Sequence, residues 1–260
     1  MPTPRAGLCL CVIIPALNEE RSLPLVLDSL AATRRSLAEA SPGIDLREII
    51  VVDNGSTDAT PRVAAAAGAT VLREPRRGYG QACLAGLDHL ERQPCDLVAF
   101  LDADFADDPA QLVELTAPIA RKEADLVLGS RLLGSPEPGA LLPQARYGNR
   151  LSVALIRLLY GHRYTDLGPF RAIGHAAIRS LGMSDRSFGW TVEMQVKALQ
   201  AGLRVREIPV VYRRRVGESK ISGTLSGTIK AGAKILWTIV RLRLQGGGAI
   251  TPARAPSSDR

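Results

Sequence analysis

The sequence has no apolar run that approaches the roughly 18 consecutive residues of a membrane-spanning helix, although 46% of its 260 residues are hydrophobic. Apolar stretches broken by charges are typical of a globular protein with a sizeable core. The uncharged stretch 6–18 leads into Glu19 and Glu20 without a small-residue cleavage site. We therefore expect a first core strand there and not a signal peptide.

Cysteine and histidine are also scarce, with four and three residues. The cysteines form no C-x-x-C pair, and the histidines share no spacing with one another or with a carboxylate pair. These absences argue against a zinc site and against a histidine general base. A G-x-S-x-G elbow is absent too, which argues against a serine hydrolase of that type. Unpaired cysteines fit a reducing compartment, so we expect a cytoplasmic protein.

Charge is unevenly distributed along the chain, whose net charge is +7. Residues 1–200 hold 21 basic and 23 acidic side chains, whereas residues 201–260 hold 12 basic and 3 acidic ones. A basic C-terminal fifth attracts anionic partners such as phosphates or a membrane surface. No nucleic-acid-binding motif accompanies it, so we do not expect nucleic acid as a partner.

Strand and helix patterns alternate through the chain, which predicts an α/β fold with a mostly parallel sheet covered on both faces. The expected strands are Leu10–Pro15, Glu48–Asp53, Thr70–Leu72, Leu97–Leu101, Leu126–Gly129 and Val205–Tyr212. The expected helices are Glu19–Ala38, Thr57–Ala67, Gly80–Leu90, Pro109–Ala120, Arg146–Tyr160 and Val192–Gln200. A Gly- and Pro-rich loop, Arg131–Gln144, is expected to lie over the site.

Two of the expected strands end abruptly in carboxylates, at Asp53 and at Asp102-Ala103-Asp104. Ligands of open α/β sheets bind beyond the carboxyl ends of the strands. Hard cations such as Mg²⁺ and Mn²⁺ take oxygen ligands and often share them with a substrate phosphate. The pattern favours a site for a divalent metal and a phosphate-bearing ligand. The alternative is that these aspartates only cap turns.

Two basic loops add to this pattern. The segment Arg76–Gly80 combines cations with a glycine-bracketed turn before a helix, which suits a phosphate or a base. It lacks the third glycine of a dinucleotide fingerprint and follows the third strand, which argues against a Rossmann dehydrogenase. The segment Arg213–Lys220 is either a phosphate clamp or a solvated basic turn.

Apolar residues recur at helical spacing near the C-terminus, with Lys230, Lys234 and Arg241 on another face beside Trp237. Such a helix either lies on an anionic membrane surface or docks on the domain as an ordinary final helix. We expect a catalytic domain over residues 1–222, this basic amphipathic helix over 223–245 and a disordered tail over 246–260.

Taken in order, these motifs resemble glycosyltransferase family 2, with its GT-A nucleotide-sugar-binding fold, and within it the dolichyl- or polyprenyl-phosphate sugar synthases. The resemblance covers residues 9–243. It rests on Ile14–Glu19, Val52–Asp58, Gly78–Gly80, Asp102–Asp104, Gly129–Arg131, Asp166–Arg171, Glu193 and Arg215–Lys220.

The resemblance implies a role for each matching position. The nucleotide would be bound by Pro15, Asn18, Glu19, Asp53, Gly78 and Asp102. The metal, Mg²⁺ or Mn²⁺, would be bound by Asp102 and Asp104. The donor diphosphate or the acceptor phosphate would contact Arg131, Arg215, Ser219 and Lys220, while Asp166, Arg171, Trp190 and Glu193 would line the sugar and acceptor side. The catalytic set would be Asp104, Asp166, Glu193 and Lys220.

The implied reaction is a single inverting displacement that moves a hexose from a nucleotide-sugar, such as UDP-glucose or GDP-mannose, to a polyprenyl phosphate. A lipid phosphate is already anionic, whereas an acceptor hydroxyl would need a carboxylate base; Asp166 and Glu193 are the candidates. We expect the protein to work in the cytoplasm, at the inner face of the membrane if the last helix binds there.

Two departures from the pattern of this family leave other functions possible. Ala106 stands where close relatives often have a metal-coordinating amide, so Asp107 or water would complete the metal shell. The C-terminal transmembrane helices of many relatives are absent from this sequence. The alternatives are transfer to a small soluble hydroxyl acceptor and a catalytically silent nucleotide-sugar-binding protein. A sugar-phosphate nucleotidyltransferase is disfavoured, because its Gly-rich N-terminal phosphate loop is missing.

Overall fold

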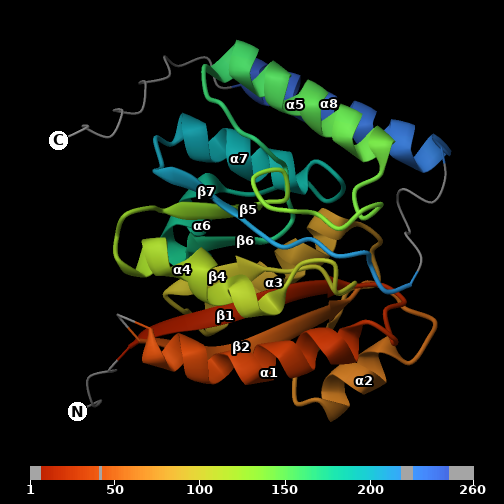
Figure 1. The fold of residues 1–260 in the computed structure, drawn as a ribbon, viewed down its shortest axis with the longest axis vertical. Helices are drawn as coiled ribbons and strands as arrows, with labels where there is room; N and C mark the ends of the chain where they lie inside the picture. Colours follow the sequence, from red (N-terminus) through yellow and green to blue (C-terminus); the bar gives the residue numbers. More distant parts are fainter. Residues whose placement is uncertain (1–6, 41–42, 218–224, 246–260) are drawn as a thin grey trace.

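A seven-stranded sheet forms the centre of the molecule in the computed structural model, which describes residues 7–40, 43–217 and 225–245 (Figure 1). The strand order is β3-β2-β1-β4-β6-β5-β7. Strand β6 runs antiparallel to both of its neighbours, β4 and β5, and the other pairs are parallel. The predicted α/β fold with a mostly parallel sheet is therefore confirmed.

The bounds of the elements follow the sequence patterns closely. The strands are β1 Leu8–Ala16, β2 Ile44–Asp53, β3 Thr70–Arg73, β4 Leu97–Phe100, β5 Leu126–Ser130, β6 Arg171–Gly174 and β7 Val205–Pro209. The helices are α1 Leu23–Glu39, α2 Thr60–Ala66, α3 Tyr79–Arg92, the 3₁₀ turn η1 Pro109–Gln111, α4 Leu112–Ala120, α5 Pro143–Tyr160, α6 His175–Leu181, α7 Trp190–Gln200 and α8 Leu225–Gln245.

The central strands are buried on both faces, which is why they consist of nearly continuous apolar runs. One apolar cluster joins the sheet to α1, α2 and α4, and a second joins its other face to α3, α5, α6, α7 and α8. The two clusters alternate along β1, because successive side chains of a strand point to opposite faces. Cys11 and Ile13 belong to one cluster, and Val12 and Ile14 to the other.

Two elements were not predicted, β6 and α6, which together span residues 171–181. Both are short, and β6 directly follows the turn-rich stretch Thr165–Phe170. The helix expected from Glu19 begins instead at Leu23. Residues 17–22 form a loop in which Asn18 takes a φ of +53°, a left-handed conformation that asparagine tolerates better than most residues.

Helices α5 and α8 lie side by side at one end of the molecule and cover α7 (Figure 1). The last helix is therefore docked on the domain through buried residues such as Ile239 and Leu242. Within the part of the chain that the structure describes, no helix is both long and apolar enough to cross a membrane. The expected tail over 246–260 lies outside the described residues.

Candidate functional site

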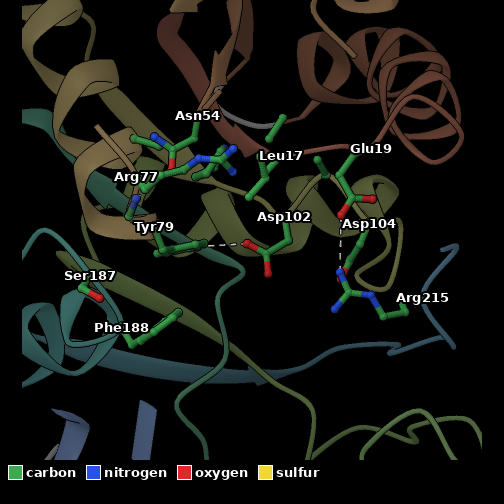
Figure 2. A pocket seen from close by; sticks show the side chains of 15 residues that line it. Leu17, Glu19, Asn54, Arg77, Tyr79, Asp102, Asp104, Ser187, Phe188 and Arg215 are labelled. Atoms are coloured by element: carbon green, nitrogen blue, oxygen red, sulfur yellow. Dashed lines mark hydrogen bonds and ion pairs between the residues drawn. The ribbon is translucent and has the colours of Figure 1, made fainter. Parts of the chain in front are cut away.

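A cavity of about 400 Å³ opens where β1, β2 and β4 end, at the edge of the sheet predicted for the site (Figure 2). It lies at the carboxyl ends of three neighbouring parallel strands, the usual ligand position in open α/β sheets. The site residues predicted from the sequence that line it are Pro15, Glu19, Gly78, Asp102, Asp104 and Arg215. The other lining residues are Ala16, Leu17, Asn54, Arg77, Tyr79, Ala82, Ala103, Ser187 and Phe188.

Asp102 and Asp104 place two carboxylates in the cavity directly after β4. The hydroxyl of Tyr79 donates a hydrogen bond to Asp102 (3.0 Å), and the backbone N–H of Ala106 donates one to Asp104 (2.9 Å). Burial, and next the negative charge of Asp104, raise the pKa of Asp102 to about 7. The negative charge of Asp102 is therefore less stable in this site than it would be in water.

Asp107 lies close to this pair and is almost fully buried. Neither of its carboxylate oxygens has a hydrogen-bond partner among the described residues. Burial, together with the charges of Asp102 and Asp104, raises the pKa of Asp107 well above its usual range. An unpartnered buried carboxyl beside two others indicates a region that a cation would stabilise.

The residues of the site fit a divalent metal, because the carboxyl groups of Asp102, Asp104 and Asp107 lie close together. Mg²⁺ characteristically binds one or two carboxylates and completes its shell with water and substrate phosphates. No cluster of three or more His, Cys, Asp or Glu side chains suited to a metal occurs in the described parts of the chain. Asp102 and Asp104, with oxygens from a bound diphosphate, would be the ligands of such a cation.

Two arginines bring positive charge to the same cavity. Arg215 forms ion pairs with Asp104 (3.1 Å) and Glu19 (3.5 Å), which join the segment after β7 to the loop after β1. Arg77 reaches the cavity from the loop before α3 and lies beside Asn54 in Figure 2. Guanidinium groups suit a diphosphate, because their planar donors match its oxygens.

The loops after β1 and β2 are tied together beside the cavity. The side-chain oxygen of Asn18 accepts a hydrogen bond from the Thr57 N–H (2.8 Å), and that of Asp53 accepts one from the Ser56 N–H (2.9 Å). Neither Asn18 nor Asp53 is among the residues that line the cavity. Asn54 does line it and also receives a hydrogen bond from the Gly78 N–H (2.8 Å).

Gly78 and Gly80 allow a close approach between α3 and the loop before α7. A β-carbon at Gly78 would lie 2.1 Å from the carbonyl oxygen of Arg186, and one at Gly80 would lie 2.0 Å from that of Asp185. Gly78 also has a φ of +146°, which other residues rarely adopt. The two glycines therefore bring residues 185–188 against the start of α3.

Arg131 and Asp166, predicted for phosphate and catalysis, bind each other outside the set of lining residues. Arg131 Nε and Asp166 Oδ2 are 2.7 Å apart, and a second hydrogen bond of 2.8 Å makes the pair bidentate. Burial alone would raise the pKa of Asp166, but the hydrogen bonds and charge of Arg131 leave it lowered. The ring of Tyr212 stacks on the guanidinium of Arg131 at 5.1 Å.

Glu193, Trp190 and Arg171 are buried in the interior and are not brought to the cavity. The carboxylate of Glu193 is completely buried and accepts hydrogen bonds from the N–H groups of Ser184 and Asp185. Trp190 packs edge-on against Phe100 in the core. Arg171 donates to the carbonyl oxygens of Gly168 and Thr191, and burial lowers its pKa.

Ser219 and Lys220, the remaining predicted site residues, lie outside the described residues. The cavity residues that sequence reasoning did not assign to the site include Leu17, Ser187 and Phe188. Leu17 was inside a motif that pointed to the site, whereas Ser187 and Phe188 carry no recognisable signal, because they reach the cavity only through tertiary packing. The loop Arg131–Gln144 contributes no lining residue to the cavity.

The sequence was compared with known protein families and with solved structures. Residues 11–182 match the model of glycosyl transferase family 2. The chain belongs to this family. It is a glycosyltransferase, and the resemblance noted in the sequence is confirmed at this level.

Several curated relatives extend over nearly the whole chain. An uncharacterized glycosyltransferase of Mycobacterium tuberculosis is 40% identical over 228 residues, which are 87% of this chain and 95% of the relative. The undecaprenyl-phosphate mannosyltransferase of Micrococcus luteus is 31% identical and covers 89% of this chain and 97% of its own. The polyprenol monophosphomannose synthase of Mycolicibacterium smegmatis is 28% identical.

Solved structures share the fold of this glycosyltransferase. Glucosyl-3-phosphoglycerate synthase of M. tuberculosis, crystallised with Mn²⁺, UDP-glucose and phosphoglyceric acid, superposes with a TM-score of 0.68. The match covers 92% of this chain and 80% of that one at 22% sequence identity. At this level of identity the likeness supports the GT-A fold.

Proposed function

We propose that this family 2 glycosyltransferase moves a hexose from a nucleotide-sugar to a polyprenyl phosphate in a metal-dependent, inverting reaction. The observation that carries the proposal is the pair Asp102 and Asp104 in a cavity at the carboxyl ends of β1, β2 and β4. The two carboxylates would hold Mg²⁺ or Mn²⁺, which when bound neutralises the charge of a departing nucleoside diphosphate.

The cavity offers complementary surfaces for the parts of a nucleotide-sugar. Pro15, Leu17 and Asn54 form an apolar and polar wall for the nucleoside, while Arg77 and Arg215 supply positive charge for the diphosphate. Asn18 and Asp53 support this wall by fixing the loops after β1 and β2. We assign Gly78 the role of bringing backbone close to the ligand.

The displacement itself requires no protein base if the acceptor is a phosphate. One of its oxygens attacks the anomeric carbon, and the bond from that carbon to the diphosphate oxygen breaks with its electron pair on the leaving group. A phosphate monoester is already ionised near neutral pH. This agrees with the positions of Asp166, which is paired with Arg131, and of Glu193, which is fully buried.

Two observations support a lipid as the carrier of that phosphate. Relatives with 31% and 28% identity over most of this chain are named for undecaprenyl phosphate and polyprenol. In addition, α5 and α8 contain no acidic residue. They expose the large apolar side chains Tyr147, Leu151, Leu158, Trp237 and Leu244, beside the exposed basic residues Arg146, Arg150, Arg157, Lys230 and Arg243.

This α5–α8 surface, defined by the ten residues above, suits the boundary between anionic headgroups and acyl chains. Leu158 is 79% exposed and Leu244 is 75% exposed, which is unfavourable in water and favourable at a membrane. Peripheral attachment at the inner face of the membrane would bring the enzyme to a lipid acceptor.

The direct test is transfer of labelled sugar into an organic-extractable product. Purified protein is incubated with Mn²⁺ or Mg²⁺, a short polyprenyl phosphate, and labelled UDP-glucose or GDP-mannose in parallel. We expect label in the organic phase with one of the two donors, and loss of this label when EDTA removes the metal.

Two other results would contradict the proposal. Metal-dependent release of UDP or GDP with all label in water would indicate a soluble hydroxyl acceptor. Binding of the nucleotide without release or transfer would indicate a silent nucleotide-sugar-binding protein.

A further inference from the structure

One wall of the cavity is built by residues 183–189, the segment between α6 and α7, which we call the wall loop. Ser187 and Phe188 of this loop line the cavity opposite Leu17 and Asn54 (Figure 2). No sequence motif predicts this segment as part of the site. Because the loop has no regular secondary structure, its position depends on contacts with the elements around it.

The wall loop is held on two sides by contacts within the catalytic domain. The buried carboxylate of Glu193 accepts hydrogen bonds from the N–H groups of Ser184 (3.1 Å) and Asp185 (2.7 Å). On the side of α3, the carbonyl oxygen of Arg186 accepts a hydrogen bond from the Gln81 N–H (3.0 Å). That of Ser187 accepts one from the Gly80 N–H (3.3 Å).

The third side of the wall loop is held by α8. Lys234 Nζ lies 2.9 Å from Asp185 Oδ2, and the carboxylate of Asp185 is fully buried. The other carboxylate oxygen of Asp185 accepts hydrogen bonds from the N–H groups of Ser187 and Gly189. Asp185 thus folds the loop with one oxygen and attaches it to α8 with the other.

Close packing at Gly189 shows how tightly this contact is built. A β-carbon at Gly189 would lie 2.4 Å from Asp185 Oδ2 and 2.6 Å from Thr238 Oγ1. Thr238 is one helical turn after Lys234, so both residues are on the face of α8 that meets the loop. The side chain of Thr238 is completely buried.

We propose that Lys234 and Asp185 are positioning residues, which hold the Ser187–Phe188 wall against the cavity and make donor affinity depend on the docking of α8. Neither residue lines the cavity. The buried carboxylate of Asp185 needs a cation, since an unpaired buried charge is costly. Without Lys234, the carboxylate of Asp185 must either take up a proton or move toward solvent, and either change weakens the contact that holds Ser187 and Phe188 in place. The proposal rests on the proposed function only in taking the cavity as the nucleotide-sugar site.

The substrate-free protein gives the first test, because Arg186 is exposed within the wall loop. Trypsin cleavage after Arg186 is followed by mass spectrometry in the full-length wild type and in Lys234→Met. Lys122→Met is the matched control, since Lys122 is an exposed lysine just after α4, on the face of the sheet opposite to α8. We expect cleavage to be about five-fold faster in Lys234→Met. Lys122→Met should match the wild type.

The second test separates positioning from general stability. Lys234→Met and Asp185→Asn should raise the KM for the nucleotide-sugar about five-fold with kcat nearly unchanged. Lys234→Arg should keep the KM near the wild-type value, because arginine keeps the positive charge. The melting temperature is measured for every variant. If no transfer is found with any acceptor, the Kd of the nucleoside diphosphate replaces KM.

The proposal is overturned if Lys234→Met and Lys122→Met are indistinguishable in both the rate of cleavage after Arg186 and donor affinity. It is also overturned if Lys234→Met lowers the melting temperature but leaves KM and Kd unchanged at temperatures where the protein is folded. A failed lipid-transfer assay with accelerated cleavage after Arg186 would contradict the proposed acceptor and leave the positioning role supported.

Discussion

Asp104 is the residue on which the proposed chemistry depends most directly. We expect Asp104→Asn to lower kcat by about a hundred-fold or more, because one charged oxygen ligand of the metal is lost. The amide oxygen of asparagine can still accept the hydrogen bond from the Ala106 N–H, so the fold should remain. Initial rates of sugar transfer at saturating Mn²⁺ give the measurement.

The matched control is Asp125→Asn. Asp125 precedes β5, at the opposite end of the parallel strands, and pairs with Arg204 in a partly exposed position. Full activity of Asp125→Asn beside loss of activity in Asp104→Asn would support the assignment. Equal activity in both variants would exclude Asp104 from the site.

Asp102 gives a prediction about pH. Its pKa of about 7 in the folded, metal-free protein exceeds the value of about 3.9 for an unfolded chain. The folded state therefore holds this proton more tightly, and ionisation of Asp102 costs stability that accumulates as pH rises from about 4 to 7. We expect Asp102→Asn to raise the melting temperature in EDTA more at pH 8 than at pH 5.

Added Mg²⁺ supplies the control for this pH prediction. The cation favours the ionised carboxylate, so it should reduce the difference in melting temperature between wild type and Asp102→Asn at pH 8. A difference in melting temperature that is independent of pH and Mg²⁺ would show that the pKa of Asp102 is not raised in the folded protein.

The motif residues near the strand ends were predictable, and the buried ones were not. Asp102, Asp104 and Glu19 follow strands whose apolar runs are visible in the sequence, and all three line the cavity. Glu193 and Trp190 carry the same family resemblance but are completely buried. Whether a motif residue on a helix faces a cavity or the core depends on how the helix rotates against its neighbours, which one sequence does not reveal.

Among the elements, α5 and α8 form the layer that covers α7 at one end of the molecule. The sequence left two interpretations of α8, a membrane-surface helix or an ordinary docked helix. The structure supports docking through Ile239 and Leu242 while leaving Trp237 and Leu244 exposed. The two interpretations are therefore compatible, because one side of the helix is packed and another meets solvent.

A double variant of α5 tests the membrane interpretation. We expect Leu151→Asp with Leu158→Asp to weaken binding to anionic vesicles at least about ten-fold, since each exposed leucine would otherwise contribute about 1–2 kcal/mol of apolar burial. Co-sedimentation with vesicles containing phosphatidylglycerol measures this change.

The control for the vesicle experiment is Leu25→Asp, because Leu25 is an exposed leucine on α1, which covers the opposite face of the sheet. Vesicle binding that is unaffected by the double variant, or equally weakened by Leu25→Asp, would show that the α5–α8 surface does not contact the bilayer.

For the molecule as a whole, alternation of strand and helix predicted the α/β fold. Among the residues that the structure describes, the antiparallel strand β6 and helix α6 were the elements that it missed. Alternation specifies which elements form. It does not specify the order of strands in the sheet or the docking of α5 and α8 over α7, since these depend on contacts between distant segments. The position of the wall loop could not be predicted for the same reason, because it depends on the packing of α3, α7 and α8 around the cavity.

The central claim is that the cavity at the ends of β1, β2 and β4 binds a divalent metal together with a nucleoside diphosphate. The most direct measurement is anomalous diffraction from crystals grown with Mn²⁺ and UDP or GDP. We predict a manganese peak beside the carboxylates of Asp102 and Asp104, with the diphosphate next to Arg77 or Arg215. A nucleotide bound elsewhere, or bound in the cavity with no manganese at these aspartates, would contradict the account.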